Sequence, residues 1–87
     1  MKEIKLFGFE GCPYCQEMKE LLENENIAYT YIDIDLIENA EIVENVIDNN
    51  GIDSVPVIWV GEVLLVPEKS FDTIQEGFEL TKRFLNE

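Results

Sequence analysis

Histidine is absent from this sequence, and cysteine occurs only twice among its 87 residues. A structural zinc site usually takes four cysteine or histidine ligands, so one copy of this chain cannot complete such a site. Two cysteines three positions apart are also too few to staple a small secreted domain with disulfides. In a reducing compartment, a neighbouring pair is more often catalytic or metal-binding than structural. The pair is therefore the first candidate for chemistry, with no metal site expected.

Positive charge is scarce as well. Six Lys and Arg residues face 19 Asp and Glu residues, which gives a formal net charge of −13. A nucleic-acid-binding protein needs a basic footprint, and this chain has none. An anionic membrane surface would repel it. The acidity favours partners with basic docking surfaces, or it is a general trait of the surface that serves solubility.

Long apolar runs are also absent from the sequence. No stretch approaches the roughly 20 apolar residues that a membrane-spanning helix requires. Residues 1–7 contain no apolar run of the length found in a secretory signal peptide. These features predict a cytoplasmic protein. Hydrophobic residues make up 46% and charged residues 29%, a mix typical of globular proteins. The length predicts one domain over residues 1–87. We expect this domain to work as a monomer.

Short apolar strands alternate with amphipathic helices along the chain. We expect strands at 4–9, 28–35, 57–60 and 63–66, and helices at 13–26, 38–49 and from about Ser70 to Leu85. The first two strands are joined through a helix and should be parallel, whereas Gly61-Glu62 predicts a hairpin between the last two. This order, β-α-β-α-β-β-α, predicts an α/β fold with a four-stranded mixed sheet of order 2-1-3-4, flanked by three helices.

The cysteines lie in the segment Cys12-Pro13-Tyr14-Cys15, between the first strand and the first helix. Pro13 suits the first turn of a helix, where a missing N–H is not needed. At a helix start, this spacing brings both sulfurs within bonding distance, and the first-turn amides and the helix dipole favour a thiolate at Cys12. We therefore expect Cys12 to be a solvent-facing nucleophile and Cys15 a partly buried resolving thiol in thiol–disulfide exchange.

Two other interpretations of the pair remain open. An iron–sulfur cluster shared by two protomers is one, since each chain could lend one thiolate and glutathione the others. Such a protein would be a dimeric carrier and not an enzyme. A pair of ordinary core cysteines is the other, although the context of strand, glycine, proline and helix argues against it.

A second motif is Ser54-Val55-Pro56, directly before the strand at 57–60. Proline at this place can simply mark the beginning of a strand. Alternatively, a cis Val55–Pro56 bond beside the cysteines would expose the Val55 backbone N–H and C=O to an incoming peptide-like disulfide. The residues alone leave both interpretations open.

Taken together, these motifs resemble those of the glutaredoxins, a family within the thioredoxin-fold superfamily. The resemblance covers nearly the whole chain. It rests on the cysteine segment, on Lys19 in the first helix, on the strand end Tyr31-Ile32-Asp33-Ile34-Asp35, and on Ser54-Val55-Pro56. It implies the thioredoxin fold and a cis bond before Pro56.

The resemblance also implies a function. It suggests an oxidoreductase that reduces disulfide-containing proteins or glutathione mixed disulfides through Cys12 and Cys15, with no bound cofactor. Tyr14 and the Val55 main chain would then contact glutathione or substrate, next to Pro13 and Pro56. Lys19 would either assist the thiolate or be a solvated charge.

The chain departs from the family pattern around its glutathione-binding positions. Glutaredoxins usually carry a lysine three residues before the nucleophile, where this chain has Phe9, followed by the acidic Glu10. They also carry a Gly-Gly pair before the last helix, whereas residues 65–70 contain no glycine and Pro67 lacks an amide donor. Ser70 could still cap that helix. The electron source is thus expected to be either glutathione or a flavoprotein reductase of the thioredoxin-reductase type, as in redoxins that serve ribonucleotide reductase.

Overall fold

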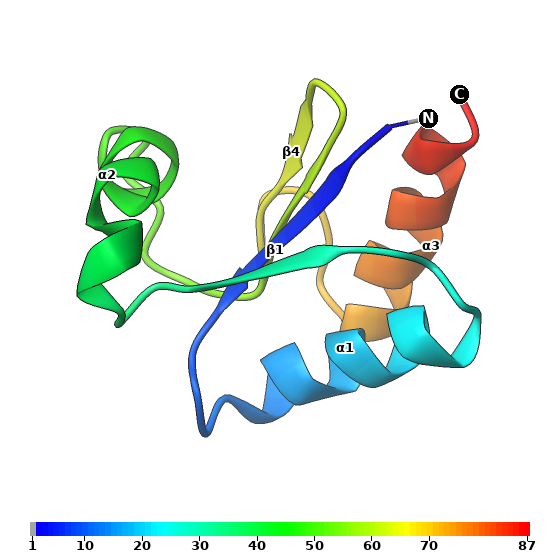
Figure 1. Ribbon diagram of the computed structural model, residues 1–87. Coiled ribbons are helices and arrows are strands. Elements are labelled where there is room, and N and C mark those ends of the chain that lie inside the picture. Colours follow the sequence, from blue (N-terminus) through cyan, green and yellow to red (C-terminus); the bar gives the residue numbers. More distant parts are fainter. Residues whose placement is uncertain (1) are drawn as a thin grey trace.

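The computed structural model describes residues 2–87, and Figure 1 shows its elements along the chain. The strands are β1 (Ile4–Gly8), β2 (Thr30–Asp33), β3 (Val57–Val60) and β4 (Val63–Leu65). The helical elements are α1 (Pro13–Asn24), η1 (Ile37–Asn39), α2 (Ala40–Val43), η2 (Glu44–Asp48) and α3 (Ile74–Leu85). Their order is the predicted one, with the second helical segment divided into three short pieces.

The strands form one mixed sheet in the order β2-β1-β3-β4, which confirms the predicted order. β1 and β2 are parallel, because α1 returns the chain to the same end of the sheet between them. β3 is antiparallel to both of its neighbours. β2 is shorter than the predicted strand over 28–35, because β1 pairs with it only from Lys5 to Gly8.

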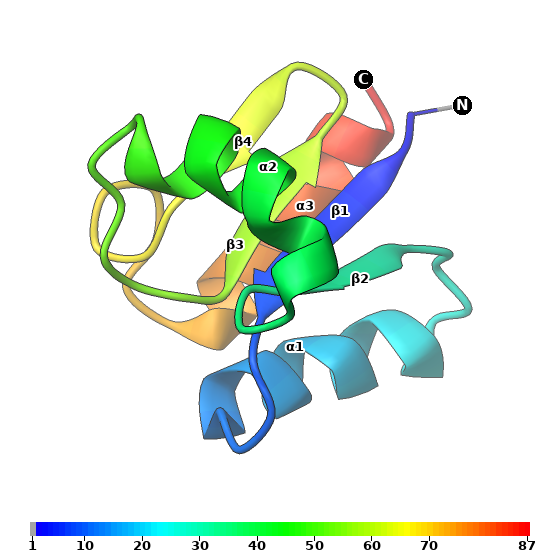
Figure 2. The same cartoon turned by 60° about the vertical axis from the view of Figure 1, so that its left-hand side comes forward.

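Each face of the sheet has its own apolar core. Leu6 and Phe7 follow one another in β1 and therefore point to opposite faces. Leu6 packs with Met18 of α1 and Phe78 of α3, whereas Phe7 packs with Ile47 of η2. Figures 1 and 2 show this division, with α1 and α3 on one side of the sheet and α2 on the other. The end of β1 is thus held from both sides.

The segment between β2 and β3 is less regular than the predicted helix over 38–49. It begins with a 3-10 turn at η1, where the Asn39 side chain donates to the Asp33 carbonyl oxygen at 2.9 Å. It ends with a π-helical turn at η2, whose wider winding buries both Val46 and Ile47 against the sheet. β-Branched side chains lower helix propensity, so packing and not propensity determines this segment.

The start of the last helix is a correction to the prediction. α3 begins at Ile74 and not near Ser70, and its N-cap is Thr73. The Thr73 hydroxyl accepts from the Glu76 N–H at 3.1 Å, while the Glu76 carboxylate accepts from the Thr73 N–H at 3.0 Å. The Ser70 hydroxyl instead accepts from the Val66 N–H at 3.0 Å. Phe71, predicted on the helix, lies before it and is buried.

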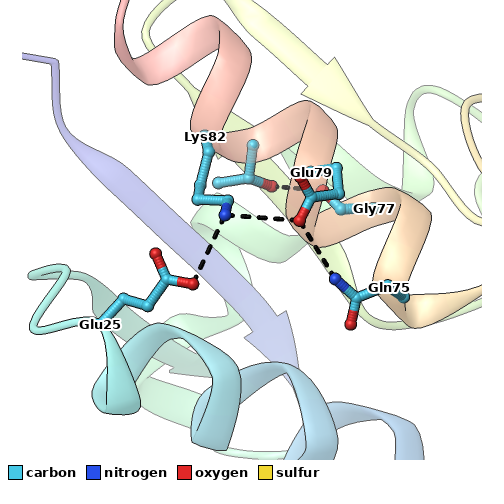
Figure 3. A network of polar contacts seen from close by, with 6 residues as sticks. Glu25, Gln75, Gly77, Glu79 and Lys82 are labelled. Carbon is cyan, nitrogen blue, oxygen red and sulfur yellow. Dashed lines mark hydrogen bonds and ion pairs between the residues drawn. The ribbon is translucent and has the colours of Figure 1, made fainter.

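Lys82 links the end of α3 to the end of α1 (Figure 3). Its Nζ lies 3.4 Å from a carboxylate oxygen of Glu25, which follows α1, and 3.3 Å from one of Glu79. The adjacent residue, Thr81, is buried, and its hydroxyl donates to the carbonyl oxygen of Gly77, one turn earlier, at 2.7 Å. Exposed ion pairs contribute only about 0–1 kcal/mol each, so the apolar contacts between α1 and α3 dominate here.

Residues 2–87 lack two kinds of feature. None of their helices combines the length and the apolar character that crossing a bilayer would demand. Within the same residues, no three Cys, Asp or Glu side chains come together as a group that could hold a metal ion.

Candidate active site

The two cysteines lie at the start of α1, directly beyond the carboxyl end of β1. Cys12 is the N-cap of the helix and Pro13 its first residue, as predicted. The cysteines form a disulfide, with 5.2 Å between their Cα atoms. The Cys15 backbone N–H donates to the Cys12 Sγ at 3.2 Å. A sulfur that receives a first-turn amide is also the one on which the helix start stabilises negative charge.

Burial of the pair differs in one respect from the prediction. Cys15 is 1% exposed, as expected, but Cys12 is only 4% exposed and does not face solvent openly. In the oxidised pair each sulfur covers part of the other, so neither presents much surface. Tyr14 between them is 63% exposed. Attack on this disulfide would therefore come past an exposed aromatic ring.

A groove of about 520 Å³ lies beside the pair and brings together most of the predicted binding residues. Tyr14 borders it from the cysteine turn, and Val55 and Pro56 border it from the loop before β3. The Val55–Pro56 bond is cis, which confirms the interpretation that the resemblance favoured. Pro13 is exposed and is not among the residues that line the groove. The remaining lining residues are Glu17, Ser54, Pro67, Glu68, Phe71, Asp72, Thr73 and Ile74.

This arrangement of a helix-start cysteine pair and a cis-proline loop has clear relatives. The sequence model of the glutaredoxin family matches residues 4–65. Glutaredoxin 3 of Escherichia coli (strain K12) is 32% identical over 60 residues, which are 69% of this chain and 70% of that protein. The chain belongs to the glutaredoxin family. Its redox-active cysteine pair is the feature on which a family of thiol–disulfide oxidoreductases depends.

Solved glutaredoxin structures share the fold. A glutaredoxin from Archaeoglobus fulgidus superposes with a TM-score of 0.70 at 26% identity, covering 100% of this chain and 89% of that one. Glutaredoxin 1 from Francisella tularensis, solved in complex with cacodylate, gives 0.67 at 23% identity and covers 100% of both chains. The predicted thioredoxin fold is thereby confirmed.

The groove carries negative charge. Three carboxylates border it, from Glu17 on α1 and from Glu68 and Asp72 in the loop before α3. None of the described residues that line it is a lysine or arginine. Directly before α3, the Asp72 and Thr73 N–H groups both donate to the Glu76 carboxylate. No cation among the described lining residues is therefore present to receive a ligand carboxylate.

The residues that precede Cys12 form the turn between β1 and α1. Gly11 has a φ of +87°, in the left-handed region that glycine tolerates, and it turns the chain from the strand into the helix. The Cys12 N–H donates to the Phe9 carbonyl oxygen at 3.3 Å. Glu10 is exposed at the corner.

Gly8 lies close to the disulfide, a feature that no motif in the sequence predicted. A Cβ built on Gly8 would lie 2.8 Å from Cys15 Sγ and 3.0 Å from the Tyr31 hydroxyl oxygen. The only sequence signal was a glycine inside a strand, which can mark a close approach. Lys19, considered either a helper of the thiolate or a solvated charge, instead lies over the Tyr31 ring, with its Nζ 4.4 Å from the ring centroid.

Proposed function

We propose that this glutaredoxin-family chain reduces protein disulfides or glutathione mixed disulfides by thiol–disulfide exchange. Cys12 is the nucleophile and Cys15 the resolving thiol, and the protein acts as a monomer in the cytoplasm. The observation that carries the proposal is the Cys12–Cys15 disulfide at the N-terminus of α1, next to a groove bordered by the cis-proline loop. This placement supplies a reactive sulfur pair together with a surface for the substrate.

In the first step, the Cys12 thiolate attacks one sulfur of the substrate disulfide. A bond forms between the two sulfurs, the substrate disulfide breaks, and its other sulfur leaves as a thiolate. The helix start supports the attacking thiolate, since the Cys15 N–H already donates to the Cys12 Sγ. The product of this step is a mixed disulfide between Cys12 and the substrate.

In the second step, the Cys15 thiol gives up its proton and attacks the Cys12 sulfur. The Cys12–Cys15 disulfide forms, and the remaining substrate sulfur leaves as a thiolate that takes a proton from water. Two electrons have then passed from the cysteine pair to the substrate. A thiol or a flavoprotein reductase returns the pair to its reduced form.

The groove residues hold the substrate near the sulfurs. Tyr14 offers an exposed ring on which an apolar part of the substrate can pack. Val55 precedes the cis bond to Pro56 and borders the groove, and we infer that its backbone N–H and C=O pair with an extended substrate segment. Pro13 keeps the cysteine turn in a helical start and leaves the first-turn amides to the sulfur.

Trapping of the mixed disulfide tests this proposal. We expect reduced Cys15→Ser protein to form a stable adduct through Cys12 when mixed with a glutathionylated peptide, detected by mass spectrometry. Reduced Cys12→Ser protein is the matched control and should form little adduct. An adduct that is equally abundant in both variants, or absent from both, would contradict the assigned roles.

A specific observation favours a flavoprotein reductase over glutathione as electron source. Glutathione carries two carboxylates and one ammonium group, so its net charge at neutral pH is negative. The groove presents the carboxylates of Glu17, Glu68 and Asp72, with no cation among its described lining residues. Repulsion between these carboxylates and those of glutathione raises the free energy of the bound state. Glutathione therefore meets an unfavourable field at the site where it would have to bind.

A two-reductant assay tests this preference. We expect faster recycling with a thioredoxin-type flavoprotein reductase than with glutathione plus its own reductase. The double variant Glu68→Gln, Asp72→Asn should recover several-fold of the rate with glutathione. The double variant Glu20→Gln, Glu62→Gln removes as much charge from exposed positions outside the groove and should recover less. Faster recycling of the unmodified protein with glutathione would overturn the preference.

A further inference from the structure

Gly8 leaves a small space between β1 and the start of α1. The position that a side chain at residue 8 would take lies 2.8 Å from Cys15 Sγ, 3.0 Å from Cys15 Cβ and 3.0 Å from the Tyr31 hydroxyl oxygen. Real Cβ atoms do not come this close, so only glycine allows the sulfur and the hydroxyl to border the same space. Tyr31 lies on β2, which pairs directly with β1. The sheet register thus brings a phenol to the buried sulfur.

The two neighbouring tyrosines use their hydroxyls differently. The Tyr29 hydroxyl donates to the Glu23 carboxylate. The Tyr31 hydroxyl, in contrast, makes no hydrogen bond with any residue among 2–87. A phenol O–H that is half-buried usually finds an acceptor. The Cys15 sulfur borders the same point beside Gly8 as this hydroxyl and can serve as its acceptor.

The charged groups around Tyr31 keep its phenol protonated. Burial raises its pKa, and the nearby carboxylates of Asp33, Glu10 and Asp35 raise it further. Lys19 approaches from α1 and lies over the ring face, not at the hydroxyl. At neutral pH, Tyr31 therefore keeps its proton and can act as a hydrogen-bond donor.

We propose that the Tyr31 hydroxyl donates a hydrogen bond to the Cys15 sulfur whenever that sulfur is a thiolate. The proposal rests on the proposed function, in which Cys15 is the resolving thiol. In the oxidised protein, Cys15 Sγ is bonded to Cys12 and is a weak, neutral acceptor. A thiolate is a far stronger acceptor, and hydrogen bonds to charged acceptors are shorter and stronger than those between neutral groups.

The hydrogen bond acts in two steps, the reduction of the Cys12–Cys15 disulfide and the resolution of the mixed disulfide. When a reductant thiolate attacks the Cys12 sulfur, a new sulfur–sulfur bond forms and the Cys12–Cys15 bond breaks. The bonding electron pair then stays on Cys15, where the Tyr31 O–H stabilises it. When Cys15 later resolves a mixed disulfide, it must first lose its proton, and the same O–H favours the thiolate. No proton leaves Tyr31 in either direction.

The pKa of Cys15 tests the inference directly. In a Cys12→Ser background, Cys15 is a single free thiol whose ionisation can be followed by the ¹³C chemical shift of its Cβ. Adding Tyr31→Phe should lower the thiolate-to-thiol ratio at a given pH about tenfold, a rise of about one pKa unit. Adding Tyr29→Phe instead should leave the ratio unchanged, because the Tyr29 hydroxyl donates to the Glu23 carboxylate.

Both comparisons measure ionisation and need no turnover, so their result is separate from that of the trapping experiment. An identical Cys15 titration in the presence and absence of the Tyr31 hydroxyl would overturn the inference, even if Cys12 forms adducts as proposed. Equal effects of Tyr31→Phe and Tyr29→Phe would also overturn it, since they would indicate a general effect of the strand. The amide spectrum of each variant confirms that it is folded.

Discussion

Tyr29 and Tyr31 are two positions apart, yet their hydroxyls have different surroundings. Tyr29 lies just before β2, and its hydroxyl donates to Glu23 near the end of α1. Tyr31 borders the space next to Cys15. Alternate residues of an extended segment point to the same face, so both rings pack on the α1 side of the sheet. One tyrosine thus ties helix to strand, and the other adjoins the redox pair.

An alkaline titration tests the role of Tyr29. Burial, the hydrogen bond to Glu23 and the charge of Glu23 raise the pKa of Tyr29 from 10.0 to about 12. The folded state therefore holds this proton more tightly than the unfolded state. Its stabilising effect is complete below pH 10 and is lost as the pH rises toward 12.

We expect the urea midpoint to fall between pH 10 and pH 12, and Tyr29→Phe to reduce that fall. Absorbance at 295 nm should show one tyrosine fewer titrating near the top of this range in the variant. If the midpoint of Tyr29→Phe falls as steeply as that of the unmodified protein, the Tyr29–Glu23 contact does not stabilise the fold.

Helix starts determine much of the site at the scale of elements. The start of α1 serves Cys12, whereas the start of α3 is closed by its own capping box of Thr73 and Glu76. Two of the borders of the groove therefore lie at helix N-termini, while the loop before β3 supplies a third. The Glu76 carboxylate already receives the Asp72 and Thr73 N–H groups directly before α3.

Replacement of the α3 cap gives a prediction for this element. Thr73→Ala removes the hydroxyl that accepts from the Glu76 N–H, and loss of such a cap costs about 1 kcal/mol. For a domain of this size, the melting temperature should fall by roughly 4–8 °C. Thr73→Ser keeps the hydroxyl and should retain most of the stability. Similar losses in both variants, measured by thermal unfolding, would show that the cap is not the cause.

Charge is the dominant feature at the scale of the whole molecule. Of the six cationic residues, five already contact a described partner: Lys2 a carbonyl oxygen, Lys19 an aromatic ring, and Lys5, Lys82 and Arg83 carboxylates. The remaining negative charge is spread over the surface and repels itself. This self-repulsion opposes the compact state.

Salt should therefore stabilise the protein. Raising NaCl from about 0.01 M to about 0.2 M shortens the screening length from roughly 30 Å to under 10 Å. We expect a higher melting temperature at the higher concentration, with KCl giving the same increase at equal ionic strength. A melting temperature that is constant or lower in salt would mean that attractive pairs outweigh the repulsion.

The sequence predicted the sheet order because it rests on short-range signals: apolar strand segments, a helical connection after the first strand and the Gly61-Glu62 turn. It also located the cysteine pair through a local motif, whereas the cis bond before Pro56 followed from the resemblance to the glutaredoxins and not from the residues alone. The true start of α3 could have been predicted, since Glu76 lies three residues after Thr73 and completes a capping box. The space beside Gly8 could not have been predicted, because it depends on which side chain of β2 lies next to β1.

Both ends of the described chain lie together, as Figures 1 and 2 show. Lys2 Nζ donates to the Phe84 carbonyl oxygen at 2.6 Å, near the end of α3. β1 starts from this side at Ile4 and leads away from it to Gly8 and the disulfide. A fluorescent reporter or an affinity handle fused at either end would therefore project from the side opposite the sulfurs, leaving the groove open for immobilised or imaging-based redox assays.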